Sequence, residues 1–134
     1  MQVGFDTSVS GKCAQQAQKW LRQSVGLFRA STDMYPGDED NGSMGAWFIL
    51  NALGLYPLSP ASGNYTLGSP IFANVSIPVL NGATLTISAV NQGPESVYVS
   101  GVTWNGATVS GVTVPYTDLI EGGELAFTMS ATPN

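Results

Sequence analysis

The sequence predicts an α+β fold in which two helices precede a small antiparallel β module. Two observations indicate this order. Over residues 12–28, apolar residues recur at spacings of three and four, the period of a helix with one buried face, and a second segment up to Leu55 is apolar on almost every side. After Pro60, apolar and polar residues alternate, which is the period of a strand. We therefore expect a helical part over residues 1–60 and a β part over residues 61–134.

The first helix is expected over residues 12–28. Its apolar face would be formed by residues that recur at helical spacing: Ala14, Ala17, Leu21, Val25 and Phe28. A turn signal, Pro36-Gly37, then separates it from the second helix.

The second helix is expected over residues 42–55, with Asp40 or Asn41 as its cap. Pro57 ends it, because proline disfavours helix in the residue before it. The segment is apolar on almost every side, which is typical of a helix enclosed by other elements. Either it is inserted in a compact core of this chain, or it belongs to a larger helical array. In the second case, Ala46, Phe48 and Leu53 should expose more apolar surface than such residues normally do.

Two Asn-Gly dipeptides mark turns in the β part, because this pair favours tight hairpins. Asn81-Gly82 lies between alternating runs at residues 71–79 and 84–89. Asn105-Gly106 follows a strand that begins near Val97, and a last strand is expected over residues 124–129. The pattern predicts about five to seven strands.

Composition excludes several classes of protein. The chain has 134 residues, of which 43% are hydrophobic and 10% charged, so it is not a disordered polypeptide. Its net charge is −5 and no Lys or Arg follows Arg29, which argues against binding to nucleic acid or to an acidic membrane surface. The longest apolar run, residues 46–55, is shorter than the roughly 20 residues that span a bilayer.

The residues available for chemistry are few. The chain has no histidine and a single cysteine, Cys13, which excludes a His-containing triad and a His/Cys metal site within it. The N-terminal residues lack the apolar core of a signal peptide. Three Asn-x-Ser/Thr sequons, at Asn41, Asn64 and Asn74, are compatible with a secreted protein.

Three adjacent acids, Asp38, Glu39 and Asp40, precede the second helix in a glycine-flanked loop. They could favour the positive end of the helix dipole. Asp38-x-Asp40 also resembles the start of an EF-hand loop, but Gly42 and Ile49 stand where such a loop needs oxygen ligands. In a third interpretation, an ionised carboxylate at this position acts as a general base that activates water.

Several ordered segments resemble the C-terminal part of glycoside hydrolase family 92. They are G-D-E-D-N-G-S-M-G-A-W at 37–47, A-L-G-L-Y-P at 52–57, Y-T-L-G-S-P at 65–70, the Asn-Gly turn at 105–106 and D-L-I-E-G-G at 118–123. The resemblance covers the chain from about Ala17 to Asn134.

The resemblance implies an inverting, calcium-dependent exo-α-mannosidase that acts on terminal α-mannosides of N-glycans, often α-1,2-linked, outside the cytoplasm: secreted, extracellular or periplasmic. Members combine an N-terminal β-sandwich with an (α/α)6 barrel. Residues 1–60 would then be the last barrel helices and residues 61–134 the C-terminal β module. The missing sandwich and the rest of the barrel would be partners of this chain, and mannose-containing glycans its ligands.

The resemblance also implies roles for the acidic loop. In the family the general base is assigned to the aspartates of this motif, which gives Asp38 and Asp40 as catalytic residues. Gly37, Glu39 and Asn41 would bind substrate or support the loop. The general acid and most calcium ligands would lie upstream, so no metal ligand is assigned here, and the chain alone is expected to be inactive.

Two other functions stay open. A free-standing carbohydrate-binding β module with a helical leader would expose aromatic residues on one sheet face. A calcium-binding structural module would rest on Asp38-x-Asp40. Trp20, Trp47 and Tyr56 are expected to pack in the core rather than stack on sugar.

Overall fold

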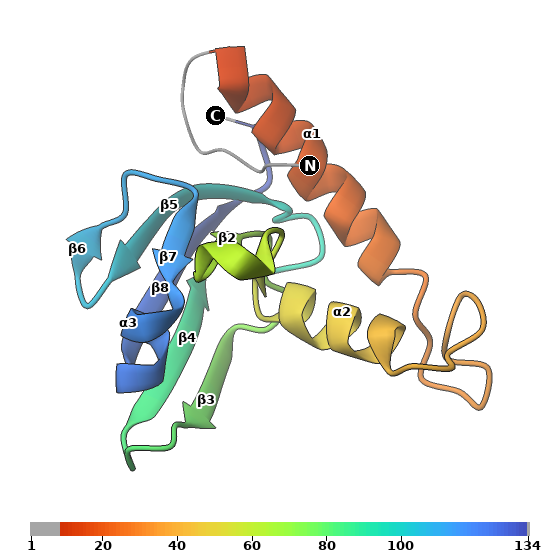
Figure 1. Ribbon diagram of the computed structural model, residues 1–134. Helices are drawn as coiled ribbons and strands as arrows, with labels where there is room; N and C mark the ends of the chain where they lie inside the picture. Colours follow the sequence, from red (N-terminus) through yellow and green to blue (C-terminus); the bar gives the residue numbers. More distant parts are fainter. Residues whose placement is uncertain (1–8, 134) are drawn as a thin grey trace.

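The fold is α+β, as predicted, with two long helices beside two sheets (Figure 1). The structure, a computed structural model, describes residues 9–133. Helix α1 is Val9–Val25 and helix α2 is Ser43–Ala52. The predicted helix at 12–28 therefore ends three residues early, since Gly26 breaks it and Phe28 leaves the helix. In Figure 1 the connection between α1 and α2 lies at the end of the helices away from the strands.

Within residues 9–133, eight strands form two sheets. The smaller has the order β1-β2-β7, and the larger has the order β3-β4-β8-β5-β6. The strands of the smaller sheet are β1 (Leu55–Tyr56), β2 (Asn64–Leu67) and β7 (Thr113–Pro115). Those of the larger are β3 (Asn74–Pro78), β4 (Thr84–Val90), β5 (Tyr98–Trp104), β6 (Ala107–Thr108) and β8 (Gly123–Ser130). Two short helices, η1 (Pro60–Ser62) and α3 (Tyr116–Glu121), complete the fold.

Both predicted hairpins form. Asn105 and Gly106 have φ angles of 48° and 81°, as a two-residue turn between β5 and β6 requires. The β3–β4 hairpin turns at Gly82, whose φ is 86°. However, β4 pairs with β8 in parallel, so the prediction of an antiparallel module is wrong for this pair. Among the described residues after Pro60, seven strands form, β2 to β8, as the predicted five to seven allow, whereas β1 lies before them where the second helix was expected to end.

The hydrophobic core belongs to the β part. Its fully buried side chains include Leu67, Ile87, Leu125 and Phe127, which come from both sheets. Within the described residues, α1 adds only a separate small cluster of Ala14 and Ala17. The alternation of buried and exposed residues along β4 and β8 is the pattern that predicted these strands.

Polar side chains of helix α1 make several hydrogen bonds to the β part. The buried Gln18 accepts a hydrogen bond from the backbone N–H of Val99 at 3.0 Å. Arg22 donates from Nε to Ser69 Oγ at 2.8 Å and from Nη2 to the Ser96 carbonyl at 2.9 Å. Ser69 is fully buried and donates in turn to the Val97 carbonyl. Burial lowers the pKa of Arg22 from its usual value.

Helix α2 is not enclosed by the rest of this chain. Only Asn51 and Ala52 are buried within it, whereas Ala46 is exposed and Ile49 is 60% exposed. Phe48 is half-buried, but Leu53 packs against the β core, so the expected exposure is wrong for Leu53. The interpretation of α2 as a helix inside a compact core of this chain is therefore wrong. No helix in the described part of the chain is long and apolar enough to cross a bilayer.

The Gln18 contact gives a stability prediction. Gln18→Met keeps the length of the side chain but leaves the buried Val99 N–H without its acceptor. Such a loss costs about 1–3 kcal/mol, which urea unfolding of the chain should report. Gln23→Met, at an exposed position of the same helix, is the control. Equal unfolding free energies for the two variants would contradict the assigned hydrogen bond.

Candidate active site

An aromatic cluster holds the connection between α1 and α2 against α2. The Phe28 ring stacks on Trp47 with centroids 5.8 Å apart and meets Phe48 at 4.9 Å. It also contacts Tyr35 edge to face at 6.1 Å. Phe28 and Tyr35 belong to the connection and the other two rings to α2, so these contacts fix the path of the chain toward the acidic loop.

The three acids of the loop have different surroundings. Glu39 is half-buried, and its Oε2 accepts a hydrogen bond from the backbone N–H of Gly45 at 2.7 Å. Asp38 and Asp40 are exposed, and their carboxylates make no hydrogen bond or ion pair with any described residue. The loop thus uses one acid internally and leaves the two aspartates available to a ligand.

The predicted cap of α2 is wrong. Gly42, with φ of 71°, is the N-cap residue, and a glycine has no side chain that could accept a hydrogen bond from the helix. Neither Asp40 nor Asn41 takes this role, because the left-handed turn at Gly42 places the start of the helix after them. Glu39 supplies the missing acceptor from further upstream.

A polar hollow of about 440 Å³ lies beside the first aspartate. It is lined by Leu27, Arg29, Asp33, Tyr35, Pro36, Gly37 and Asp38. The structure therefore brings Gly37 and Asp38 to one concave surface, whereas Asp40 and Asn41 are exposed outside it. Sequence reasoning missed Arg29, Asp33 and Tyr35. The only feature of the sequence that could have indicated these residues is their position in the connection between α1 and α2, which also contains the acidic loop.

The predicted calcium cofactor has no complete site in the described part of the chain. No group of three or more His, Cys, Asp or Glu residues lies there close enough to hold a metal ion. Calcium takes six to eight oxygen ligands, which two exposed aspartates do not provide. The residues present therefore do not fit a whole calcium site.

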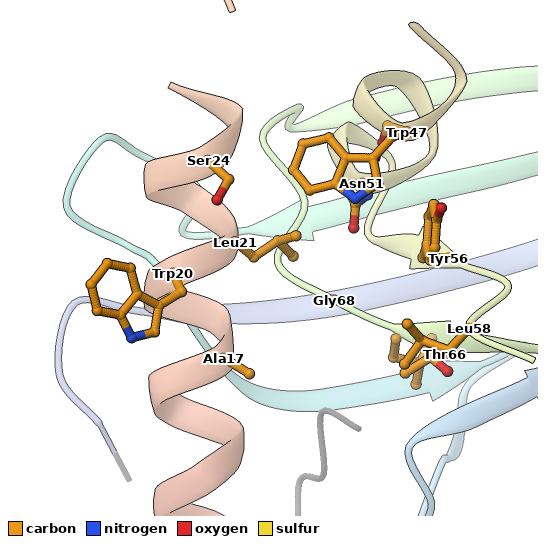
Figure 2. A pocket seen from close by; sticks show the side chains of 11 residues that line it. Ala17, Trp20, Leu21, Ser24, Trp47, Asn51, Tyr56, Leu58, Thr66 and Gly68 are labelled. Atoms are coloured by element: carbon orange, nitrogen blue, oxygen red, sulfur yellow. Dashed lines mark hydrogen bonds between the residues drawn. The ribbon is translucent and has the colours of Figure 1, made fainter. Parts of the chain in front are cut away.

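A second hollow, of about 260 Å³, lies between α1, α2 and the smaller sheet (Figure 2). Trp47, Tyr56 and Leu21 line it from these three elements, and Trp47 and Tyr56 are half-buried. Trp20 of α1 also lines the hollow but is 61% exposed, so its predicted place in the core is wrong (Figure 2). The hollow is mostly apolar and contains none of the loop acids.

Comparison with known proteins decides the family. The profile of the "Glycosyl hydrolase family 92 catalytic domain" matches residues 9–131. The chain belongs to glycosyl hydrolase family 92. The match takes in both helices, the acidic loop and nearly all of the β part.

Solved family 92 structures share the fold. An α-mannosidase of the family from Bacteroides thetaiotaomicron is 33% identical, with a TM-score of 0.83 over 90% of this chain and 17% of its own. A family 92 inverting mannosidase from the same species is 31% identical, with a TM-score of 0.82 over 90% and 16%. An uncharacterized secreted glycosidase from Arthroderma benhamiae is 31% identical over 90% of this chain and 16% of its length. The chain thus spans about a sixth of each relative.

The aromatic cluster gives a prediction for this family 92 chain. Phe28→Leu keeps an apolar side chain but removes the ring that meets Tyr35, Trp47 and Phe48. Each lost ring pair is worth about 0.5–1.5 kcal/mol beyond burial, so the unfolding free energy should fall measurably in a denaturant titration. Leu27→Ala, at an exposed neighbouring position, should change it by no more than about 0.5 kcal/mol. A neutral Phe28→Leu would mean that the cluster does not hold the connection.

Proposed function

We propose that the chain is the C-terminal part of an inverting exo-α-mannosidase and supplies the general base through Asp38 and Asp40. The observation that carries this proposal is the difference in surroundings among the three acids. Only Glu39 is engaged by the fold, whereas both aspartates are exposed and free of internal partners. Membership of family 92, and relatives described as an α-mannosidase and an inverting mannosidase, support the same reaction.

The proposed reaction follows the mechanism of glycosidases that invert the configuration at the anomeric carbon. One carboxylate takes a proton from water as the oxygen of that water attacks the anomeric carbon. A carboxylic acid on the opposite side, about 6.5–9.5 Å away, protonates the leaving oxygen as the glycosidic bond breaks. Asp38 at the hollow and the exposed Asp40 are the two candidates for the base. The second of the pair would orient the water, and the acid would come from sequence upstream of this chain.

The remaining parts of the proposal concern what lies outside this chain. Terminal α-1,2-linked mannose of N-glycans is the proposed substrate, and calcium is the proposed cofactor, held mainly by upstream ligands. The N-terminal β-sandwich and the rest of the barrel would cover apolar residues that are exposed in this chain: Trp20 on α1, Leu27 just after it and Ile49 on α2. A location outside the cytoplasm is supported by the secreted relative.

The alternative of a free-standing sugar-binding β module gains no support from the exposed aromatic residues. Phe127 is buried, and Tyr65, Tyr98 and Trp104 are half-buried. The two exposed aromatic residues of the β part, Phe72 and Tyr116, both lie outside the strands. No sheet face in the described residues therefore offers the aromatic platform that this alternative requires.

The isolated chain should release no mannose from α-mannosides, with or without calcium. It would lack the general acid, whose contribution is typically about 10²–10⁴-fold, and most of the substrate pocket. A sugar-release assay with the purified 134-residue chain tests this. Calcium-dependent turnover by the pure chain would overturn the proposal.

In the full-length enzyme, obtained by extending the reading frame upstream, Asp38→Asn and Asp40→Asn should each lower kcat. A fall of about 10²–10⁴-fold is expected when a general base loses its charge. Folding and calcium dependence should persist, because neither carboxylate has a partner among the described residues. Glu95→Gln, at an exposed site in the β part, is the control. Near-normal kcat in both aspartate variants would remove the catalytic assignment.

A further inference from the structure

We infer that Glu39 is a positioning residue whose carboxylate clamps the acidic loop to the first turn of α2 and thereby sets the places of Asp38 and Asp40. The inference rests on the proposed function, since it concerns how the base is held. It gives the middle acid of the trio a role that differs in kind from those of its neighbours.

The first step is the hydrogen bond itself. Gly42 is the N-cap of α2, so Gly45 stands at the third position of the helix, whose N–H is normally bonded by the cap side chain. Gly42 has no side chain to do this, and Glu39 Oε2 accepts the Gly45 N–H instead at 2.7 Å. A charged acceptor at a helix N-terminus is favoured both by the hydrogen bond and by the helix dipole.

The second step is the absence of a side chain at Gly45. A Cβ atom there would lie 3.2 Å from the Tyr35 hydroxyl and 4.0 Å from Glu39 Oε2. The ends of the Tyr35 and Glu39 side chains therefore both lie beside Gly45 in the first turn of α2. Because they precede and follow Asp38 in the sequence, the loop is held on both sides of that aspartate.

The third step separates positioning from chemistry. Glu39 is half-buried and its bonded oxygen is directed to the helix, whereas both aspartates are exposed. Glutamine keeps an acceptor oxygen at the same distance from the backbone, and alanine removes it. If Glu39 only positions the loop, Glu39→Gln should preserve function and Glu39→Ala should not.

Amide hydrogen exchange in the 134-residue chain tests the clamp directly. The Gly45 N–H should exchange about tenfold faster or more in Glu39→Ala, which removes the acceptor, and at an intermediate rate in Glu39→Gln, which keeps an acceptor oxygen without its charge. Glu95→Ala removes an exposed acid and is the control. Unchanged Gly45 exchange in Glu39→Ala would overturn the clamp, whatever the chain catalyses.

Kinetics of the full-length enzyme tests the consequence. Glu39→Ala should lower kcat by about 10–100-fold with KM within about twofold, because displaced catalytic groups lose rate rather than ground-state binding. Glu39→Gln should restore kcat.

The outcomes are distinguishable. Faster Gly45 exchange with normal kcat in Glu39→Ala would reduce the clamp to a local stabilising contact. A Glu39→Gln enzyme as inactive as Glu39→Ala would make the carboxylate itself part of the chemistry and overturn the positioning role. Normal kcat in both Asp→Asn variants would refute the proposed function and the positioning role together. The exchange experiment would still report the hydrogen bond between Glu39 and Gly45, because it does not depend on catalysis.

Discussion

The close approach of two backbone segments at Gly54 and Gly68 is the constraint on which the arrangement of helices and sheets depends. The Gly68 N–H donates to the Gly54 carbonyl at 2.7 Å, and the Ile71 N–H donates to the Ala52 carbonyl at 3.0 Å. A Cβ on Gly54 would lie 3.1 Å from the Phe127 ring and 3.0 Å from Pro70, and one on Gly68 would lie 3.0 Å from Leu21. Side chains at these positions would push α1 and α2 away from the core. The glycines of A-L-G-L-Y-P and Y-T-L-G-S-P therefore serve one contact.

This junction explains how a chain with a core only in its β part still places two helices. The end of α2 is held by backbone hydrogen bonds at the glycines, and α1 by Gln18, Arg22 and Ser69. The apolar face of α1 is buried at Ala14, Ala17 and Val25, whereas part of the apolar surface of α2, at Ala46 and Ile49, stays outward. A chain that spans about a sixth of its relatives is expected to show such a surface, because most of their length lies outside the matched region.

Local patterns in the sequence predicted most of the fold. The helical and strand periods, and the turn at Asn105-Gly106, depend on neighbouring residues and are confirmed. The parallel pairing of β4 with β8 was missed, since it joins strands far apart in the sequence and leaves the period of each unchanged. The short helix α3 was missed too, because six residues are too few for a helical period.

At the candidate site, composition located the loop but not the roles within it. Cap preferences pointed to Asp40 or Asn41, which are good cap residues by type. The left-handed Gly42 moved the start of the helix, and the longer side chain of Glu39 reached the free N–H from six residues away. Cap preferences concern the residue type at the start of the helix, so they do not predict a hydrogen bond from a side chain six residues away.

That Glu39, rather than an aspartate, accepts the N–H group at the start of α2 also affects what the two aspartates can do chemically. A capping aspartate would use a carboxylate oxygen to accept a hydrogen bond from a backbone N–H group of the helix, and that oxygen would be less available to accept a proton from water. With the helix N–H bonded to Glu39, neither aspartate is used in this way, and both stay exposed beside a helix terminus that favours negative charge. The loop thereby separates the acid that holds its shape from the acids that can accept a proton.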